Sequence, residues 1–306
     1  KLLDDDKIQK IVDEIIDEKL QLKQNYIFTS IPKYRVLAGR LKKVIKQSMK
    51  YIVDSLKFSK FDVLGHEMEF KSQKEYPPIE IKLENGKTVE ITGKIDRIDI
   101  AKTADGNYIR IIDYKSSVKD INLNEVKAGL QLQLLTYMDA VCEIEDVLPA
   151  GVLYFNLIDP TIKANSHLSQ EEIEFELRKQ FKMKGLILAD IDVAQMMDTN
   201  LEKGSSNVIP AYVDKDGNLS QKSSSVTRKQ FEDLQKYTKN MLSKISEEIL
   251  SGKIDVKPYY KVKGGKTPCE YCSYKSICQF NNGICKNSYY YIGNINKDAI
   301  LEQIAK

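Results

Sequence analysis

Two stretches of sequence predict the fold: Gly93-Lys94-Ile95-Asp96-Arg97-Ile98-Asp99 and Ile111-Ile112-Asp113-Tyr114-Lys115-Ser116. Each is short, rich in isoleucine and typical of a β-strand. Between them lies Ala104-Asp105-Gly106-Asn107, whose Asp-Gly pair is a strong signal for a hairpin turn. The sequence therefore predicts an antiparallel pair of strands joined by a tight turn.

The register of this hairpin decides which acidic side chains meet. Asp113 and Lys115 are two residues apart, so both side chains leave the same face of an extended strand. A hairpin centred between residues 105 and 106 places position 96 opposite position 115. Asp96 and Asp113 are then diagonal neighbours, roughly 7–8 Å apart. A slip of one residue would send Asp96 to the other face.

Two carboxylates and an ammonium on one patch are what metal-assisted phosphodiester cleavage requires. Carboxylate oxygens hold Mg²⁺ or Mn²⁺, usually through one or two side chains plus water and substrate phosphate. An ammonium nearby orients the attacking water or stabilises the negative charge that develops. In the alternative interpretation, Asp96 pairs with Arg97 or Lys94, and Asp113 forms an ordinary surface ion pair with Lys115. Isoleucines flank the charges on both strands, as in a buried central strand, which favours a functional site.

A helix is predicted from Asn122 to about Ile144, with Asn122 or Asn124 as its N-cap. Its apolar stripe includes Gln133 and Tyr137, which are four residues apart and therefore lie on one face. The polar ends of these two side chains suggest that the helix covers the sheet and directs an amide and a phenol toward the predicted site. The alternative is that Tyr137 is ordinary core and Gln133 an edge residue.

These segments resemble the RecB-type branch of the PD-(D/E)xK nucleases, and more closely the C-terminal nuclease domain of the AddB family. The resemblance runs from about residue 61 to residue 280. It rests on the two strand motifs, on Gln131–Tyr137, and on three further segments, Ala150–Phe155, Lys182–Asp190 and Pro268–Phe280. It implies an α/β fold of the restriction-endonuclease type, a mixed sheet flanked by helices, with a helical N-terminal region and a C-terminal cysteine-cluster segment.

The resemblance also implies roles for particular residues. Asp96 and Asp113 are expected to bind the metal together with the carbonyl oxygen of Tyr114, and Lys115 is expected to be the catalytic lysine. Gln133 and Tyr137 match the motif that follows the site in the family. The implied activity is a metal-dependent DNA exonuclease in double-strand break repair. It acts on the 5′-ended strand of unwound DNA with an AddA-type helicase–nuclease partner, and ATP is used only through the parent complex.

One part of the family pattern is missing. The family has a metal-binding histidine in an upstream helix, whereas the two histidines of this chain, His66 and His167, lie in other contexts. Residues 1–4 resemble the segment just after that helix. We therefore expect this chain to be a fragment of a longer polypeptide, with full activity of the fragment in doubt.

The cysteine pattern predicts a metal or iron–sulfur site. Cys269, Cys272 and Cys278 have a regular spacing that isolated thiols do not need, and Cys285 follows. By resemblance, the first three are ligands of a [4Fe–4S] cluster whose fourth ligand lies upstream of this chain, so the cluster is expected to be incomplete here. Cys285 is either a substitute ligand or a bystander. The fifth cysteine, Cys142, is expected to be a buried thiol.

Charge and composition bound the remaining possibilities. The net charge of +3 does not by itself indicate a nucleic-acid partner, but residues 33–60 carry nine Lys or Arg and one acid. Within them Lys42, Lys43, Lys46 and Lys50 share a helical flank that either follows a phosphate backbone or is simply solvated. No apolar run approaches ~18 residues, so no membrane span is expected. The five cysteines, without a secretory signal, favour a cytoplasmic location.

Four regions are expected along the chain: a helical part over 1–60, the catalytic core over 61–157, an elaboration with a long helix over 158–250, and the cysteine segment with a last helix over 251–306. Two other functions are considered. One is a different enzyme of the same branch, such as a CRISPR-adaptation nuclease. The other is a catalytically inert module that only steers DNA, which the intact Asp96, Asp113 and Lys115 argue against.

Overall fold

The computed structural model describes residues 4–22, 30–164, 167–284 and 288–306. The chain forms two compact units whose segments alternate along the sequence. The first unit contains Lys1–Glu67, Ile95–Asp120 and Glu145–Thr227, and the second contains Met68–Lys94, Ile121–Ile144 and Arg228–Lys306. The four regions expected from the sequence stay a prediction, and the boundaries of the compact units do not coincide with theirs.

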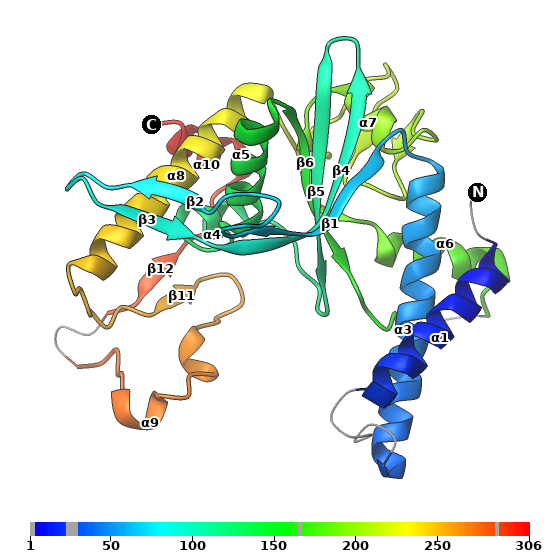
Figure 1. Ribbon diagram of the computed structural model, residues 1–306, viewed down its shortest axis with the longest axis horizontal. Coiled ribbons are helices and arrows are strands. Elements are labelled where there is room, and N and C mark those ends of the chain that lie inside the picture. Colours follow the sequence, from blue (N-terminus) through cyan, green and yellow to red (C-terminus); the bar gives the residue numbers. More distant parts are fainter. Residues whose placement is uncertain (1–3, 23–29, 165–166, 285–287) are drawn as a thin grey trace. The chain divides into compact units, whose positions relative to one another are not determined.

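A mixed six-stranded sheet, most of which belongs to the first unit, forms the frame of the predicted site (Figure 1). In spatial order its strands are β1 (Asp62–Phe70), β4 (Gly93–Thr103), β5 (Gly106–Lys115), β6 (Leu148–Asn156), β7 (Lys184–Leu188) and β10 (Ser225–Val226). β4 pairs antiparallel with β5, β5 parallel with β6, β6 antiparallel with β7, and β7 parallel with β10. The predicted α/β fold with a mixed sheet is thereby confirmed.

The central strands are buried on both faces, as their isoleucine-rich sequences predict. In β5, Ile109 and Ile111 on one side and Ile112 on the other are at most 1% exposed, and Val152 and Leu153 of β6 are fully buried. A charged side chain in such strands requires a partner or a function, because its desolvation costs free energy.

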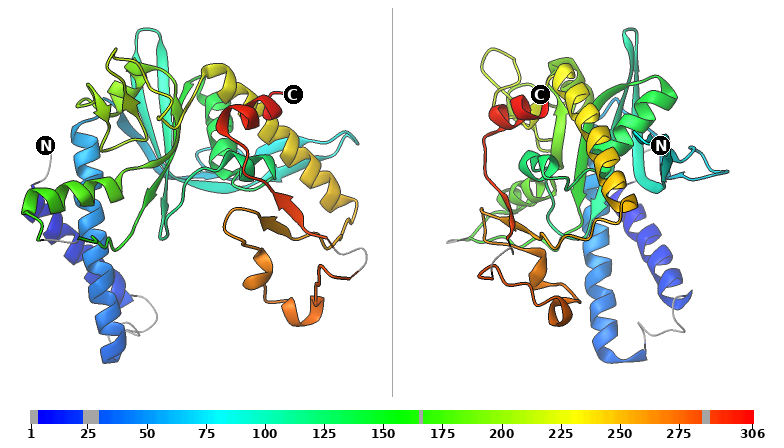
Figure 2. Two further views of the ribbon diagram at one scale, coloured as in Figure 1. Left: turned by 180° about the vertical axis from the view of Figure 1, so that it is seen from behind. Right: turned by 90° about the vertical axis from the view of Figure 1, so that its left-hand side faces the viewer.

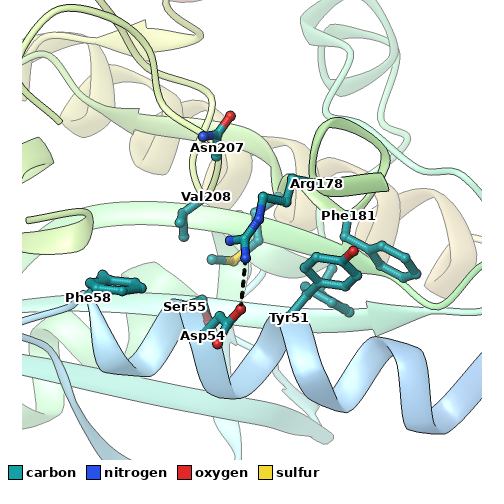
Figure 3. Close-up of a pocket in the computed structure, with 10 residues that line it drawn as sticks. Tyr51, Asp54, Ser55, Phe58, Arg178, Phe181, Asn207 and Val208 are labelled. Atoms are coloured by element: carbon teal, nitrogen blue, oxygen red, sulfur yellow. Dashed lines mark hydrogen bonds and ion pairs between the residues drawn. The ribbon is translucent and has the colours of Figure 1, made fainter. Parts of the chain in front are cut away.

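Helices of the first unit pack on the sheet through aromatic stacking. Tyr51 of α3 (Pro32–Lys57) stacks on Phe181 at the end of α6 (Gln170–Phe181), with ring centroids 4.5 Å apart. Phe181 in turn stacks on Phe155 of β6 at 6.1 Å. Beside this stack, Arg178 and Asp54 form an ion pair of 3.3 Å (Figure 3). The hollow between them measures only about 30 Å³, room for about one water molecule, so it is a packing defect and not a ligand site.

Two further helices belong to the described part of the first unit. α1 (Asp5–Leu22) lies beside α3 in both views of Figure 2. α7 (Ile191–Met197) begins at Asp190, whose carboxylate accepts hydrogen bonds from two backbone amides. The elaboration also contains a small ladder of β8 (Gly204–Ser205) and β9 (Tyr212–Val213).

The second unit contains the elements between and after these segments. They are β2 (Ile79–Lys82), β3 (Thr88–Ile91), α4 (Leu123–Lys127), α5 (Gln133–Glu145), α8 (Arg228–Leu250), β11 (Tyr259–Lys261), η2 (Pro268–Glu270), α9 (Lys275–Cys278), β12 (Tyr290–Ile292) and α10 (Lys297–Ile304). β2 and β3 pair antiparallel, and β11 and β12 pair parallel. α8 ends before Gly252, which has a positive φ of 71° and stops the helix.

The predicted continuous helix from Asn122 to Ile144 is wrong, because it is two helices. Asn122 does cap the first, α4, by accepting a hydrogen bond from the Asn124 amide at 3.0 Å. The chain then passes through the left-handed region at Gly129 (φ 80°) and Gln131 (φ 55°), which no α-helix tolerates in its interior. The apolar stripe predicted across both halves is therefore interrupted.

Within the described residues, none of the helices is long and apolar enough to span a bilayer.

Gly185 provides a test of how closely β7 approaches β6. Its φ is +139°, and a Cβ built there would lie 2.2 Å from the carbonyl oxygen of Val152. Gly185→Ala should lower the free energy of unfolding by about 3 kcal/mol or more, because backbone would have to move. Gly204→Ala is the matched control: its φ is also positive, +82°, but nothing lies within 4 Å.

The control should cost only about 1 kcal/mol, the penalty of the left-handed conformation alone. Urea unfolding followed by circular dichroism measures both variants. Equal losses for the two would show that the close approach of β7 to β6 is absent.

Candidate active site

The observed register of the hairpin differs from the predicted register by two residues. It still places the predicted acids on one face of the sheet. Thr103 pairs with Gly106 and Arg97 with Ile112, so the two-residue turn is Ala104-Asp105 and not Asp105-Gly106. Continuing this register places Asp96 opposite Asp113 instead of Lys115. The predicted register is wrong, but the predicted face is right, because a shift of two residues preserves the side to which every side chain points.

Asp113 and Lys115 form a close ion pair in the sheet. Lys115 Nζ lies 2.7 Å from Asp113 Oδ2, and the ammonium also lies 5.8 Å from the ring centroid of Tyr154. Asp113 is only 4% exposed, so this is not the ordinary surface ion pair of the alternative interpretation. Burial raises the pKa of the Asp113 carboxyl; Lys115 opposes that shift, and the negative charge of Asp96 adds to it.

Asp96 is held against the same strand by the backbone. Its Oδ2 accepts a hydrogen bond from the Tyr114 amide at 2.9 Å. This bond ties the carboxylate to the peptide unit that follows Asp113. The two carboxylates therefore lie next to each other, with Lys115 beside Asp113.

This donor set fits a hard divalent cation. The buried Asp113 Oδ2 contacts Lys115 only as an ion pair and makes no well-aligned hydrogen bond among the described residues. Mg²⁺ commonly uses one or two carboxylates and completes its shell with water and substrate phosphate. A protein cage of three or more His, Cys, Asp or Glu side chains does not occur in the described parts of the chain. Asp96 and Asp113 are therefore the two side chains here that could hold such a cation, and their role as metal ligands stays a prediction.

On the opposite face, β4 and β5 carry a buried ion-pair network that was missed in the sequence. Arg97 donates through Nε and Nη2 to the two carboxylate oxygens of Asp99, at 2.6 Å each. Arg110 Nε donates to Asp99 Oδ2 at 2.9 Å, and its guanidinium lies 4.9 Å from the ring centroid of Phe61. Asp99 and Arg110 are fully buried. The alternative in which Arg97 neutralises Asp96 is therefore wrong.

A signal for this network was present in the sequence. Arg97 and Asp99 are two residues apart in a strand that is apolar on both sides, and Arg110 lies in the partner strand. Arg97 also donates through Nη1 to the Tyr114 hydroxyl at 3.3 Å. Charged residues of opposite sign that share one face of a buried hairpin predict such a pair.

Gln133 and Tyr137 meet within the second unit. Gln133 Nε2 lies 3.5 Å from the Tyr137 hydroxyl, which also accepts a hydrogen bond from the Lys94 amide at 3.2 Å. A Cβ at Gly93 would lie 2.3 Å from that hydroxyl, so glycine makes room for the phenol. The Tyr137 ring stacks on Phe70 at 5.5 Å. Their catalytic role stays a prediction.

The four lysines predicted to contact DNA lie on α3, and three of them have acidic partners. Lys42 lies 2.5 Å from Asp17, and Lys46 lies 2.5 Å from Asp13 of the same helix, α1. Lys50 pairs with Glu174 of α6 at 3.1 Å. The fourth, Lys43, is exposed. DNA binding by Lys42, Lys43, Lys46 and Lys50 stays a prediction, and intramolecular ion pairs compete with it.

The three cysteines of the predicted cluster line one hollow of about 490 Å³ in the second unit. Cys269 is half-buried, whereas Cys272 and Cys278 are exposed, and all three are free thiols. In the described residues they do not converge as a metal-binding group. Cys285 lies outside the described residues. The iron–sulfur cluster therefore stays a prediction.

Comparison with known proteins identifies the family. Residues 1–279 match the PD-(D/E)XK nuclease superfamily. The B subunit of the ATP-dependent helicase/deoxyribonuclease of Acetivibrio thermocellus is 41% identical over 99% of this chain and 27% of that protein. The protein of the same name from Thermoanaerobacter sp. (strain X514) is 37% identical over 99% of this chain and 27% of its own length. That of Clostridium novyi is 42% identical over 96% of this chain and 26% of its own length.

The chain spans about a quarter of the length of these curated relatives. The resemblance to AddB-type proteins and to PD-(D/E)xK nucleases is confirmed.

The cysteines differ in environment, which predicts a difference in reactivity. Burial, with a contribution from Asp139, raises the pKa of the Cys142 thiol to about 12. At pH 8 only about one in ten thousand Cys142 side chains is then the reactive thiolate. Treatment of the metal-free chain with iodoacetamide at pH 8 should modify the exposed Cys272 and Cys278 and leave Cys142 unmodified.

Peptide mass spectrometry measures the modification of each cysteine over time, and modification in urea is the control that shows Cys142 can react once unfolded. The structure places Cys142 in a half-buried position and not in the fully buried one expected from the sequence. Equal rates for Cys142 and Cys272 in the native chain would contradict the raised pKa of the Cys142 thiol.

Proposed function

The chain belongs to the PD-(D/E)XK nuclease superfamily, and we propose that it hydrolyses phosphodiester bonds of DNA at Asp96, Asp113 and Lys115. The observation that carries the proposal is the meeting of these three side chains on one face of the central hairpin. Two carboxylates that lie next to each other on neighbouring central strands are unfavourable without a cation. A catalytic site explains their position, whereas a purely structural role does not.

Asp96, Asp113 and the carbonyl oxygen of Tyr114 would hold a divalent metal, Mg²⁺ or Mn²⁺. When bound, the metal supplies Lewis-acid stabilisation of the phosphate and lowers the pKa of a bound water. The hydrogen bond from the Tyr114 amide to Asp96 Oδ2 orients that carboxylate, so the chain holds its ligands before any cation arrives.

Lys115 would act on the attacking water or on the charge of the phosphate oxygens. Its ammonium is positioned from two sides, by Asp113 Oδ2 at 2.7 Å and by the Tyr154 ring at 5.8 Å. A bound cation would compete with Lys115 for Asp113 and leave the ammonium available to substrate. Gln133 and Tyr137 are proposed to contribute, as the family resemblance implies.

We further propose that the parent protein is the B subunit of an AddAB-type helicase–nuclease. The relatives carry the name of the B subunit of an ATP-dependent helicase/deoxyribonuclease, which supports this assignment. In that setting the domain would be an exonuclease on the 5′-ended strand of unwound DNA during recombinational repair. An AddA-type protein would be its partner, ATP would act through the complex, and Cys269, Cys272 and Cys278 would bind a [4Fe–4S] cluster. The same relatives argue against a CRISPR-adaptation nuclease.

The proposal is tested by replacing one carboxylate. Asp113→Asn should lower metal-dependent cleavage of end-labelled single-stranded DNA by about 100-fold or more, because it removes a metal ligand at the reacting phosphate. Asp105→Asn is the matched control: it makes the same chemical change in the exposed turn of the same hairpin. Gel analysis in Mg²⁺, Mn²⁺ and EDTA measures the cleavage.

A stability measurement separates catalysis from folding. Because burial disfavours the charged carboxylate of Asp113, Asp113→Asn should not lower the midpoint of thermal unfolding. Full cleavage by Asp113→Asn in the presence of Mg²⁺ would overturn the proposed site.

A further inference from the structure

The first unit contains a hollow of about 240 Å³ whose wall is strongly basic. It lies where α6, β7 and the ladder of β8 and β9 meet. Its charged lining consists of Lys179, Lys182, Lys184 and Lys222, against one carboxylate, that of Asp120. Two hydroxyl groups, of Ser205 and Ser224, complete the polar wall.

Most of these lysines have no ion-pair partner in the part of the chain that the structure describes. Lys182 Nζ donates to a neutral group, the Ser205 hydroxyl, at 2.9 Å, and Lys222 lies 4.9 Å from the ring centroid of Tyr212. Among the described residues no carboxylate forms an ion pair with Lys182, Lys184 or Lys222. Lys179 is the exception, with Glu176 at 2.6 Å.

Burial lowers the pKa of the Lys182 ammonium, and the charge of Asp198 only partly opposes this shift. An anion in the hollow would relieve that penalty. The lysines of α3 differ in this respect, because three of them already have acidic partners.

The strand register connects this hollow to the catalytic face. Asp113 of β5 pairs with Tyr154 of β6, and Tyr154 pairs with Lys184 of β7. Residues paired in register point to the same face of a sheet, so all three side chains lie on one side. Neighbouring strands are about 4.8 Å apart, which places the Lys184 Cα roughly 10 Å from the Asp113 Cα. Tyr154, the residue between them, already contacts the Lys115 ammonium.

We propose that this basic hollow binds phosphate groups of the DNA strand that is cleaved at Asp113, next to the scissile phosphate. The inference rests on the proposed nuclease function and names the part of the unit that holds the substrate. Lysine ammoniums and serine hydroxyls all donate to phosphate oxygens, and the volume suits one or two phosphates of a single strand. The DNA strand would cross β5, β6 and β7 on the face that carries Asp113, Tyr154 and Lys184.

Binding without cleavage tests the proposal directly. A fluorescein-labelled 20-residue oligothymidylate is titrated into the 306-residue chain carrying Asp113→Asn, and anisotropy is measured over a range of salt concentrations. With the added triple change Lys182→Gln, Lys184→Gln and Lys222→Gln, the dissociation constant should rise at least about tenfold. The plot of the logarithm of the association constant against the logarithm of the salt concentration has a negative slope, and its magnitude should fall by about 2. Each of the three lost phosphate contacts removes about 0.7 from that magnitude on a single strand.

The matched control is a second triple change, Lys102→Gln, Lys163→Gln and Lys215→Gln. These three lysines are exposed, belong to the same unit and do not line the hollow. The control removes the same net charge and should leave the slope within about 0.5 of the parent value. Equal slopes for the two triple variants would overturn the proposal.

A cleavage experiment separates binding in the hollow from damage to the site. Bis(p-nitrophenyl) phosphate is a phosphodiester too short to reach the hollow. In the presence of Mn²⁺ and with Asp113 intact, the Lys182, Lys184 and Lys222 variant should hydrolyse it at the parent rate, yet cleave the oligothymidylate at least tenfold more slowly. Equal losses on both substrates would overturn the proposal. If the parent chain cleaves neither, the proposed nuclease function fails, and the anisotropy measurement still decides whether the hollow binds DNA.

Discussion

The antiparallel pairing of β4 with β5 is the constraint on which the candidate site depends. Side chains alternate between the faces of a strand, so the register of this one hairpin assigns every charged residue to a side. Asp96, Asp113 and Lys115 fall on one face, and Arg97, Asp99 and Arg110 on the other. The parallel pairing of β5 with β6 then extends the first group sideways to Tyr154.

The buried network on the second face explains why this register is held. Asp99 and Arg110 are directly opposite each other in the hairpin. A slip by two residues would preserve both faces but would separate this pair and leave buried charges uncompensated, at a cost of about 3–5 kcal/mol. Buried ion pairs contribute little net stability compared with apolar packing. Their effect here is to make one register more favourable than its neighbours.

The sequence was sufficient for the family, the mixed sheet and the face that carries the acids, because these depend on side-chain periodicity and on motif order. It was insufficient where a single backbone conformation decides the outcome. The turn at Ala104-Asp105 moved the register by two residues, and left-handed conformations at Gly129 and Gln131 divided an expected helix. The sequence also did not predict ion pairs between residues that are far apart along the chain. For example, nothing near Lys46 in the sequence indicates Asp13 as its partner.

The alternation of the two units along the chain has a consequence for biosynthesis. The backbone passes from one unit to the other five times, at the junctions 67/68, 94/95, 120/121, 144/145 and 227/228. On the ribosome, the hairpin of β2 and β3 emerges well before α8, a helix of the same unit that is translated more than a hundred residues later. Contacts between such distant segments slow folding and prolong the exposure of apolar surface. Neither unit is a continuous segment: the last residue of the first unit is Thr227, so that unit is fully translated while the second still lacks α8 and everything after it.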